Sequence, residues 1–305
     1  MSYFEAQAPE CQTKTCPKDV DMVLIPRTVD LGGFDVRRVL PARERRMVGP
    51  FVFWDQFGRS EFLTGTGIDV RPHPHIGIAT LTYLFEGSIL HRDNLGSAQV
   101  ITPGDVNLMV AGSGIAHSER TGQDVRKHPH TLFGLQIWLA LPGDKQEIDP
   151  SFHHHTVDSL PIVEADGITM RIVTGKFHGV KSAVNTVSDN VFVDVQMQPG
   201  STLSFPAEAE ERAIHIVSGN ITVGKQSYQD AHMLILQPGH PITIRADDSA
   251  RVILLGGAAL DGPRHLWWNF VSTSKERIEQ AKQDWLNGRF AKIPGDEEEF
   301  IPLPK

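Results

Sequence analysis

The sequence has few of the features that mark secreted, membrane or nucleic-acid-binding proteins. Its 305 residues include only two cysteines, Cys11 and Cys16, so no disulfide framework can hold the fold together. A local redox pair is one interpretation of these two residues. Ordinary thiols in a polar N-terminal segment are favoured, because no secretory signal precedes them. No apolar run approaches the roughly 20 residues that span a bilayer, so we expect a cytoplasmic protein without a membrane partner.

Positive charge is also scarce. The chain has 29 Lys and Arg against 37 Asp and Glu, which gives a formal net charge of −8 at pH 7. A surface of that overall sign repels the phosphates of nucleic acids and of anionic lipids. We therefore expect no direct nucleic-acid partner.

Glycine and proline, in contrast, are abundant, with 27 and 20 residues. They separate short apolar runs that are rich in Ile, Val, Thr and Phe, which is the pattern of strands joined by tight turns. The predicted strands of the first half are 78–85, 98–101, 106–110 and 132–141. Those of the second half are 191–197, 213–217, 221–223, 232–236, 242–244 and 252–255.

The two halves share a local pattern. In each half an apolar strand runs into a glycine turn, and a Pro-Gly turn follows at Pro103-Gly104 and at Pro238-Gly239. This repetition is typical of a duplicated β-barrel, although Pro-Gly turns are common. We therefore predict an all-β fold with this division: a flexible N-terminal tail at 1–20, a first barrel at 21–150, a second barrel at 151–270, and a C-terminal helix and tail at 271–305.

The C-terminal segment is predicted to begin with a helix. Residues 273–276 match a capping box, in which a hydroxyl and a glutamate satisfy the first free amides of a helix. Apolar side chains, among them Trp285, then recur at helical spacing, and Gly288 supplies a stop. We expect a helix over 274–287 that packs on the barrels through Trp285, and we interpret the acidic run 296–299 as a solvated surface.

Two pairs of potential metal ligands stand out in the first half. His73 and His75 lie two residues apart on an extended segment, so their side chains project from the same face. His117 and Glu119 repeat that geometry. If strand pairing brings the pairs together, they offer three imidazoles and a carboxylate. Such donors suit Fe(II), Mn, Ni, Cu or Zn, and four ligands leave positions open for a substrate on an octahedral metal.

Spacing alone leaves another interpretation open. With 14 histidines in the chain, a His-x-His pair also arises by chance, and further ones occur at 128–130 and 153–155. The histidines of the first pair could instead be satisfied by backbone carbonyls, with His117 and Glu119 forming a simple hydrogen-bonded pair. Context favours the metal site, because the first pair opens a glycine-bounded strand and the second follows the turn Gly112-Ser-Gly114.

Longer stretches resemble the pirin family of the cupin superfamily, across nearly the whole chain. The matching stretches are Pro50-Phe-Val-Phe-Trp-Asp55, His73-Pro-His-Ile-Gly77, Thr82-Tyr-Leu-Phe-Glu-Gly87, His91-Arg-Asp-Asn-Leu-Gly96, Pro103-Gly-Asp105 and Gly112-Ser-Gly-Ile-Ala-His-Ser-Glu119. The resemblance implies a bicupin, which has two facing β-barrels of the jelly-roll type. It also implies a metal in the N-terminal barrel only, held by His73, His75, His117 and Glu119.

The resemblance implies a function as well. It suggests an oxidoreductase of the quercetin 2,3-dioxygenase type, acting on flavonol-type or related enol aromatic substrates with O2. One divalent metal is implied, Fe(II) first, with Mn, Co, Ni, Cu or Zn as alternatives, and Glu119 is the catalytic residue that receives the substrate's hydroxyl proton. No organic cofactor is expected. The alternative is a metal-binding regulatory protein that binds protein partners without catalysis.

His91 and Asp93 belong to one of the matching stretches. A hairpin formed by 78–85 and 89–92 would place them away from the metal ligands. We therefore expect these two residues to stabilise a turn.

Overall fold

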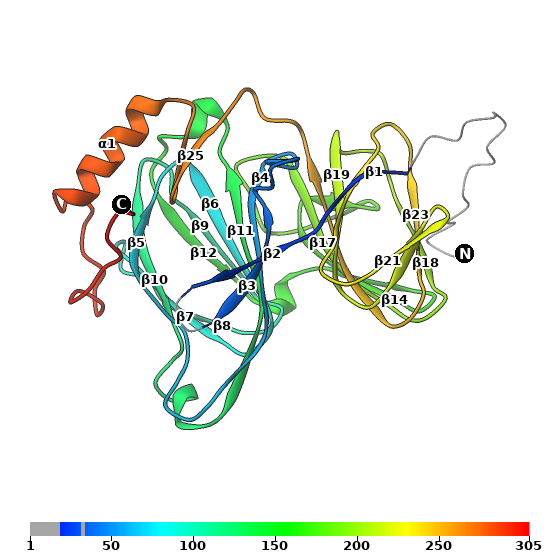
Figure 1. The fold of residues 1–305 in the computed structure, drawn as a ribbon, viewed down its shortest axis with the longest axis horizontal. Helices are drawn as coiled ribbons and strands as arrows, with labels where there is room; N and C mark the ends of the chain where they lie inside the picture. Colours follow the sequence, from blue (N-terminus) through cyan, green and yellow to red (C-terminus); the bar gives the residue numbers. More distant parts are fainter. Residues whose placement is uncertain (1–18, 32–33, 305) are drawn as a thin grey trace. The chain divides into compact units, whose positions relative to one another are not determined.

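The computed structural model describes residues 19–31 and 34–304. It divides into two compact units (Figure 1). Unit 1 comprises the described residues up to Arg27, then Val39–Val52 and Asp158–Ala259. Unit 2 comprises Thr28–Arg38, Phe53–Val157 and the residues from Leu260 onward. The predicted N-terminal tail, with both cysteines, lies outside the described residues except for its last two positions.

Unit 2 is built on two sheets. The larger has seven strands, which are in spatial order β12 (Ser151–His155), β9 (Val106–Val110), β6 (Ile78–Glu86), β11 (His130–Ala140), β4 (Phe51–Phe62), β3 (Asp35–Leu40) and β2 (Arg27–Asp30). The smaller has four strands, β5 (Asp69–His75), β10 (Ile115–Arg120), β7 (Ile89–Asp93) and β8 (Ala98–Ile101). The unit also contains the hairpin β25 (His265–Trp267) and β26 (Phe270–Ser272), and the helix α1 (Lys275–Leu286).

Unit 1 repeats this architecture. Its larger sheet has seven strands, which are in spatial order β1 (Val20–Leu24), β22 (Met233–Leu236), β19 (Glu211–Ser218), β24 (Ala250–Gly257), β17 (Asn190–Met197), β14 (Ile168–Thr174) and β13 (Ile162–Ala165). Its smaller sheet has four strands, β18 (Thr202–Phe205), β23 (Ile242–Ala246), β20 (Ile221–Val223) and β21 (Gln226–Tyr228). A short hairpin, β15 (Lys176–Phe177) and β16 (Val180–Lys181), completes the unit.

The predicted all-β fold, with two similar units and a C-terminal helix, is confirmed. Every strand predicted from an apolar run is present, some with bounds shifted by one or two residues. Each unit is a pair of open sheets rather than a closed barrel, because a seven-stranded and a four-stranded sheet share no hydrogen-bonded edge. Double-sheet packing of this kind is typical of jelly rolls.

A group of buried histidines distinguishes the interior of unit 2. In unit 1, buried Ile, Val, Leu, Met and Phe side chains from both sheets form one large cluster. Unit 2 also buries many apolar side chains, but among them lies a group of polar ones, His73, His75, His91, Asp93 and His117. Burying polar groups is costly unless they find partners, so such a concentration marks a functional site rather than a packed core.

The helix α1 begins one residue later than the predicted capping box. Ser274 is the N-cap, and its hydroxyl accepts a hydrogen bond from the Arg277 amide at 3.2 Å. The hydroxyl of Thr273, which the prediction placed in that role, accepts instead from Gln146 Nε2 at 3.0 Å. The predicted packing through Trp285 is confirmed, since Trp285 packs against an apolar cluster that includes Ile76 and Phe270 of unit 2. Within 19–31 and 34–304 no helix is long and apolar enough to cross a membrane.

Candidate metal centre

Strand pairing brings the two predicted ligand pairs together. In the antiparallel ladder of β5 and β10, His117 lies directly opposite His73, so both side chains project from the same face. His75 lies two residues farther along β5 and shares that face. The ring centroids are 4.3 Å apart for His73 and His117, and 5.0 Å apart for His75 and either of the other two rings. Three imidazoles therefore meet at one point of the smaller sheet.

The tautomers of His73 and His75 follow from the contacts of Nδ1, the ring nitrogen that points away from the centre. Nδ1 of His73 lies 2.8 Å from the Arg71 carbonyl, and Nδ1 of His75 lies 3.2 Å from the Asn269 carbonyl. A carbonyl can only accept, so each Nδ1 carries the proton. Burial lowers the pKa of His73 to about 4, and burial together with the charge of His73 lowers the pKa of His75 well below its usual value. Both rings are neutral at pH 7, and each has a free lone pair on Nε2.

The inner nitrogens, Nε2 of His75 and Nε2 of His117, have the spacing of two ligands on one metal ion. Nε2 of His75 lies 3.1 Å from Nε2 of His117. With metal–nitrogen bonds of about 2.1 Å, neighbouring ligand nitrogens lie roughly 3.0–3.4 Å apart. A hydrogen bond between these nitrogens would need the His117 proton on Nε2. With that proton on Nδ1, both Nε2 atoms present lone pairs to each other, as the ligands of one cation do. Ligand nitrogens of His73, His75 and His117 all lie within 4.8 Å of one another, and this donor set fits a transition metal.

Glu119 lies beside this group but is offset from it. A register shift between β10 and β5 falls between His117 and Glu119, and Glu119 pairs with Val70 as a result. Its carboxylate forms a second group with His91 and His117, within the same 4.8 Å limit. The four predicted ligands therefore fall into two overlapping groups that share His117.

The Glu119 carboxyl is buried, and burial raises its pKa. The neighbouring His91 imidazole and the hydrogen bond from Thr82, at 3.3 Å between Oγ1 and Oε1, oppose that rise. A divalent cation nearby would favour the ionised form of such a carboxylate and bind it.

His91 and Asp93 lie in the centre, where the sequence prediction did not place them. Nδ1 of His91 lies 3.4 Å from Nδ1 of His117, and Nε2 of His91 lies 3.0 Å from Oδ2 of Asp93. The expected position away from the ligands is wrong, because β7 pairs with β10 as well as with β8. The predicted turn role is confirmed for Asp93, since its Oδ1 accepts from the amides of Leu95 and Ser97 at 3.0 Å each.

Aromatic side chains form one wall of the centre. Trp138 meets the His75 ring edge-on, with 5.1 Å between centroids. Phe53 stacks on Trp138 at 3.9 Å, with 13° between the ring planes. The guanidinium of Arg38 lies 4.4 Å from the Phe53 centroid and binds both oxygens of Asp55 at 2.7 Å. Trp138 and Phe53 therefore pack an aromatic layer against the histidines.

Comparisons with known proteins identify the family. A family model described as Pirin matches residues 33–139, and one described as the Pirin C-terminal cupin domain matches residues 192–291. The two matches cover more than half of the chain. The chain belongs to the pirin family. A pirin-like protein of Caulobacter vibrioides is 48% identical over 290 residues, which cover 94% of this chain and 100% of that protein.

Two solved structures resemble this pirin-family chain closely enough to compare. A quercetin 2,3-dioxygenase from Acinetobacter baumannii has a TM-score of 0.87 and 34% identity, and the match covers 93% of this chain and 95% of that one. A bacterial pirin from Escherichia coli in complex with nickel(II) has a TM-score of 0.62, with 78% of this chain and 99% of that one covered. At 19% identity, the second likeness shows the fold alone.

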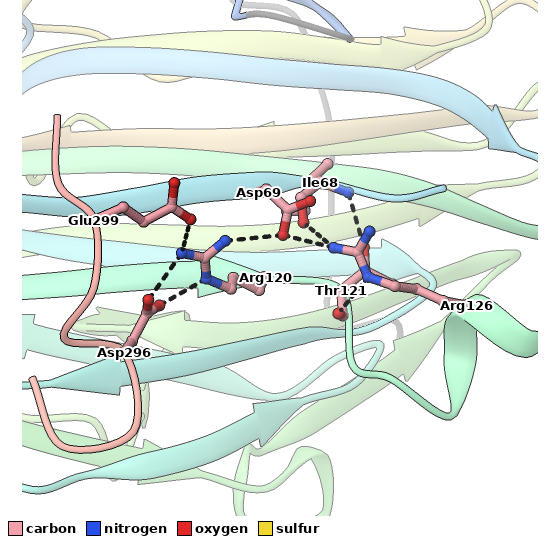
Figure 2. A network of polar contacts seen from close by, with 7 residues as sticks. All are labelled: Ile68, Asp69, Arg120, Thr121, Arg126, Asp296 and Glu299. Carbon is pink, nitrogen blue, oxygen red and sulfur yellow. Dashed lines mark hydrogen bonds and ion pairs between the residues drawn. The ribbon is translucent and has the colours of Figure 1, made fainter. Parts of the chain in front are cut away.

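The C-terminal segment of this pirin-family chain binds the strand that carries His117 and Glu119. Arg120 follows Glu119 on β10, and its Nε donates to Oδ2 of Asp296 at 2.6 Å (Figure 2). Its Nη2 donates to Oε1 of Glu299 at 2.7 Å, and its Nη1 donates to Asp69 of β5 at 3.0 Å. The side chain of Asp296 is only 8% exposed. The interpretation of the acidic run as a solvated surface is therefore wrong for Asp296.

We expect the contact between Arg120 and Asp296 to stabilise the fold above acidic pH. Burial raises the pKa of Asp296, but the hydrogen bond and charge of Arg120 outweigh burial and hold this pKa below 3.8. A carboxyl with a lower pKa in the folded chain contributes its stability above the unfolded pKa and loses it as the pH falls through the folded pKa. Asp296→Asn should therefore cost about 1–2 kcal/mol of unfolding free energy between pH 5 and 8, and less as the pH approaches 3.

Urea unfolding of the wild type and the variant across this pH range measures the effect. Asp124→Asn is the matched control, because its ion pair with Lys127 is exposed and should contribute almost nothing. A loss for Asp296→Asn that stays the same from pH 7 to pH 3 would contradict the assignment.

Proposed function

We propose that unit 2 binds one divalent transition metal through His73, His75, His117 and Glu119 and catalyses a quercetin 2,3-dioxygenase-type oxidation. The observation that carries the proposal is the 3.1 Å approach of the inner nitrogens of His75 and His117 in a buried site. Fe(II) is the first candidate, with Mn, Co, Ni, Cu and Zn as alternatives. The 34% identity to the Acinetobacter baumannii quercetin 2,3-dioxygenase supports the substrate class.

A metal bound by these residues would supply Lewis acidity that lowers the pKa of a flavonol's 3-hydroxyl group. Glu119 belongs to the second ligand group, beside His117, and its carboxylate accepts the hydroxyl proton. Oγ1 of Thr82 lies 3.3 Å from Oε1 of Glu119 and 3.0 Å from Oε1 of Gln136, so the carboxylate belongs to a polar cluster at the edge of the centre. The reaction needs O2 as its second substrate.

The stacked pair of Phe53 and Trp138 would contact the flat ring of an aromatic substrate. Trp138 contacts the proposed ligand His75, so a planar substrate ring packed against Trp138 would lie beside the metal. Both aromatic side chains are largely buried, which keeps water from that side of the reacting ring.

Turnover of quercetin tests the proposal directly. The chain is loaded in turn with Fe(II), Mn, Co, Ni or Cu, and absorbance and O2 uptake are followed together. We expect at least one metal to support coupled loss of quercetin and O2, and His75→Ala to reduce the rate by at least about a hundredfold. The dioxygenase proposal fails if no metal supports turnover and His75→Ala matches the wild type. Metal binding without turnover would favour the regulatory alternative.

A further inference from the structure

His117, which both ligand groups share, differs from the other two histidines in what holds its outer nitrogen. His73 and His75 donate Nδ1–H to backbone carbonyls, which fixes their tautomers. Nδ1 of His117 instead faces another imidazole nitrogen, Nδ1 of His91, at 3.4 Å. A ring nitrogen of neutral histidine can either donate or accept, so this contact alone leaves the His117 proton on either nitrogen.

Asp93 removes this ambiguity. Its Oδ2 lies 3.0 Å from Nε2 of His91, and a carboxylate can only accept, so His91 carries its proton on Nε2. Nδ1 of neutral His91 is then an acceptor, and His117 must donate its Nδ1–H to it. The lone pair of His117 is left on Nε2, which faces Nε2 of His75 at 3.1 Å.

Neither Asp93 nor His91 is free to turn. The amides of Leu95 and Ser97 bind Oδ1 of Asp93, which leaves Oδ2 for His91. The His91 ring stacks on Phe152, with 4.4 Å between centroids and 11° between planes. His91 is 3% exposed and Asp93 is fully buried, so water does not compete for either contact.

We propose that Asp93 and His91 are positioning residues that fix His117 in the tautomer whose lone pair points at the metal. The inference rests on the proposed metal site, because it assigns these residues the role of orienting one ligand of that site. Groups that hold the other nitrogen of a ligand histidine orient the ring and raise its basicity. Here the holding group is an imidazole that is itself oriented by a carboxylate, so the effect of Asp93 must pass through His91.

The first test reads the tautomers directly. The chain is labelled with ¹⁵N-histidine and stripped of metal with a chelator, and two-bond ¹H–¹⁵N correlations show which ring nitrogen carries each proton. We expect Nδ1–H on His117 and Nε2–H on His91. In Asp93→Asn the amide group donates where Oδ2 accepted, so both rings should exchange tautomers and His117 should carry Nε2–H. Wild-type His117 with its proton on Nε2 would overturn the proposal.

The second test measures affinity for Ni(II) by competition with a chelator. Asp93→Asn is expected to weaken binding about ten- to a hundredfold. Asp105→Asn is the matched control, because Asp105 is a buried turn aspartate of the same unit that accepts from the amides of Thr102 and Val157. This control should change Ni(II) affinity less than about threefold if generic loss of a turn has little effect on the site.

A double-mutant cycle separates positioning from general structural support. His91→Phe keeps the stacking on Phe152 but removes the Nδ1 acceptor. In that background Asp93→Asn should weaken Ni(II) binding less than about threefold further, since its route to His117 is gone. Fully additive losses would overturn the proposal.

The outcomes also distinguish this inference from the proposed function. If the wild type does not bind Ni(II) at all, the metal site fails while the tautomer spectrum still decides the roles of Asp93 and His91. If the wild type binds Ni(II) but Asp93→Asn and Asp105→Asn lose the same affinity, the positioning role is wrong and the metal site stands.

Discussion

Replacing His117 by alanine is expected to weaken divalent-metal binding by more than about a hundredfold. His117 belongs to both groups of potential ligands, so its loss removes a nitrogen from the three-histidine group and separates Glu119 from it. Losing a residue that merely orients a ligand costs about ten- to a hundredfold in affinity, and losing the ligand itself costs more. Competition between the chain and a chelator for Ni(II) measures the change.

His153→Ala is the control for this experiment. His153 is exposed and belongs to the run of three histidines at 153–155, so the variant removes one imidazole from the chain without touching the centre. We expect its Ni(II) affinity to stay within about twofold of the wild type. A larger loss for His153→Ala than for His117→Ala would place the bound metal at the exposed histidines instead.

Replacing Gly77 by alanine is expected to destabilise unit 2 by about 4 kcal/mol or more. Gly77 has a φ of +67°, and a Cβ atom at this position would lie 2.0 Å from the Val271 carbonyl oxygen. The backbone cannot retreat without loss, because the Gly77 amide donates to Gly112 at 2.9 Å and its carbonyl accepts from Leu141 at 3.0 Å. Backbone strain costs about 1–2 kcal/mol, and the clash adds the rest.

Gly96→Ala separates the two contributions. Gly96 also has a positive φ, +94°, but a Cβ there would meet nothing within 4 Å. This variant should therefore lose only the strain energy, about 1–2 kcal/mol, when both are compared by urea unfolding. Equal losses for the two variants would show that the close approach to Val271 contributes nothing.

The sequence predicts the strands well because local patterns determine them. The runs at 98–101, 106–110 and 221–223 become strands with the predicted bounds, each enclosed by turn residues. The convergence of His73 and His75 with His117 could likewise be anticipated, since alternation along a strand fixes which side chains share a face.

Alternation along a strand does not reveal which strands are neighbours. The position of His91 depends on β7 pairing with β10, and no periodicity within 89–93 encodes that choice. The offset of Glu119 depends on a one-residue register shift, which moves the carboxylate into the second group. A ladder register is a property of two segments together, so the faces could be predicted and the partners could not.

Long-range polar contacts escaped prediction for a similar reason. Asp296 binds Arg120 across 176 positions of sequence, and an acidic run by itself is typical of a solvated face. At the start of α1, Gln146 donates a hydrogen bond to the Thr273 hydroxyl from 127 positions away, and Ser274 is the N-cap. In both cases the deciding partner lies far from the local pattern.

Metal content tests the central claim most directly. Elemental analysis of the purified chain is compared with that of a His73→Ala/His117→Ala double variant prepared in the same way. The proposed centre predicts about one transition-metal ion per wild-type chain and almost none in the double variant, because the ligands left cannot hold the ion. Full retention of metal by the double variant would contradict a centre built on these histidines.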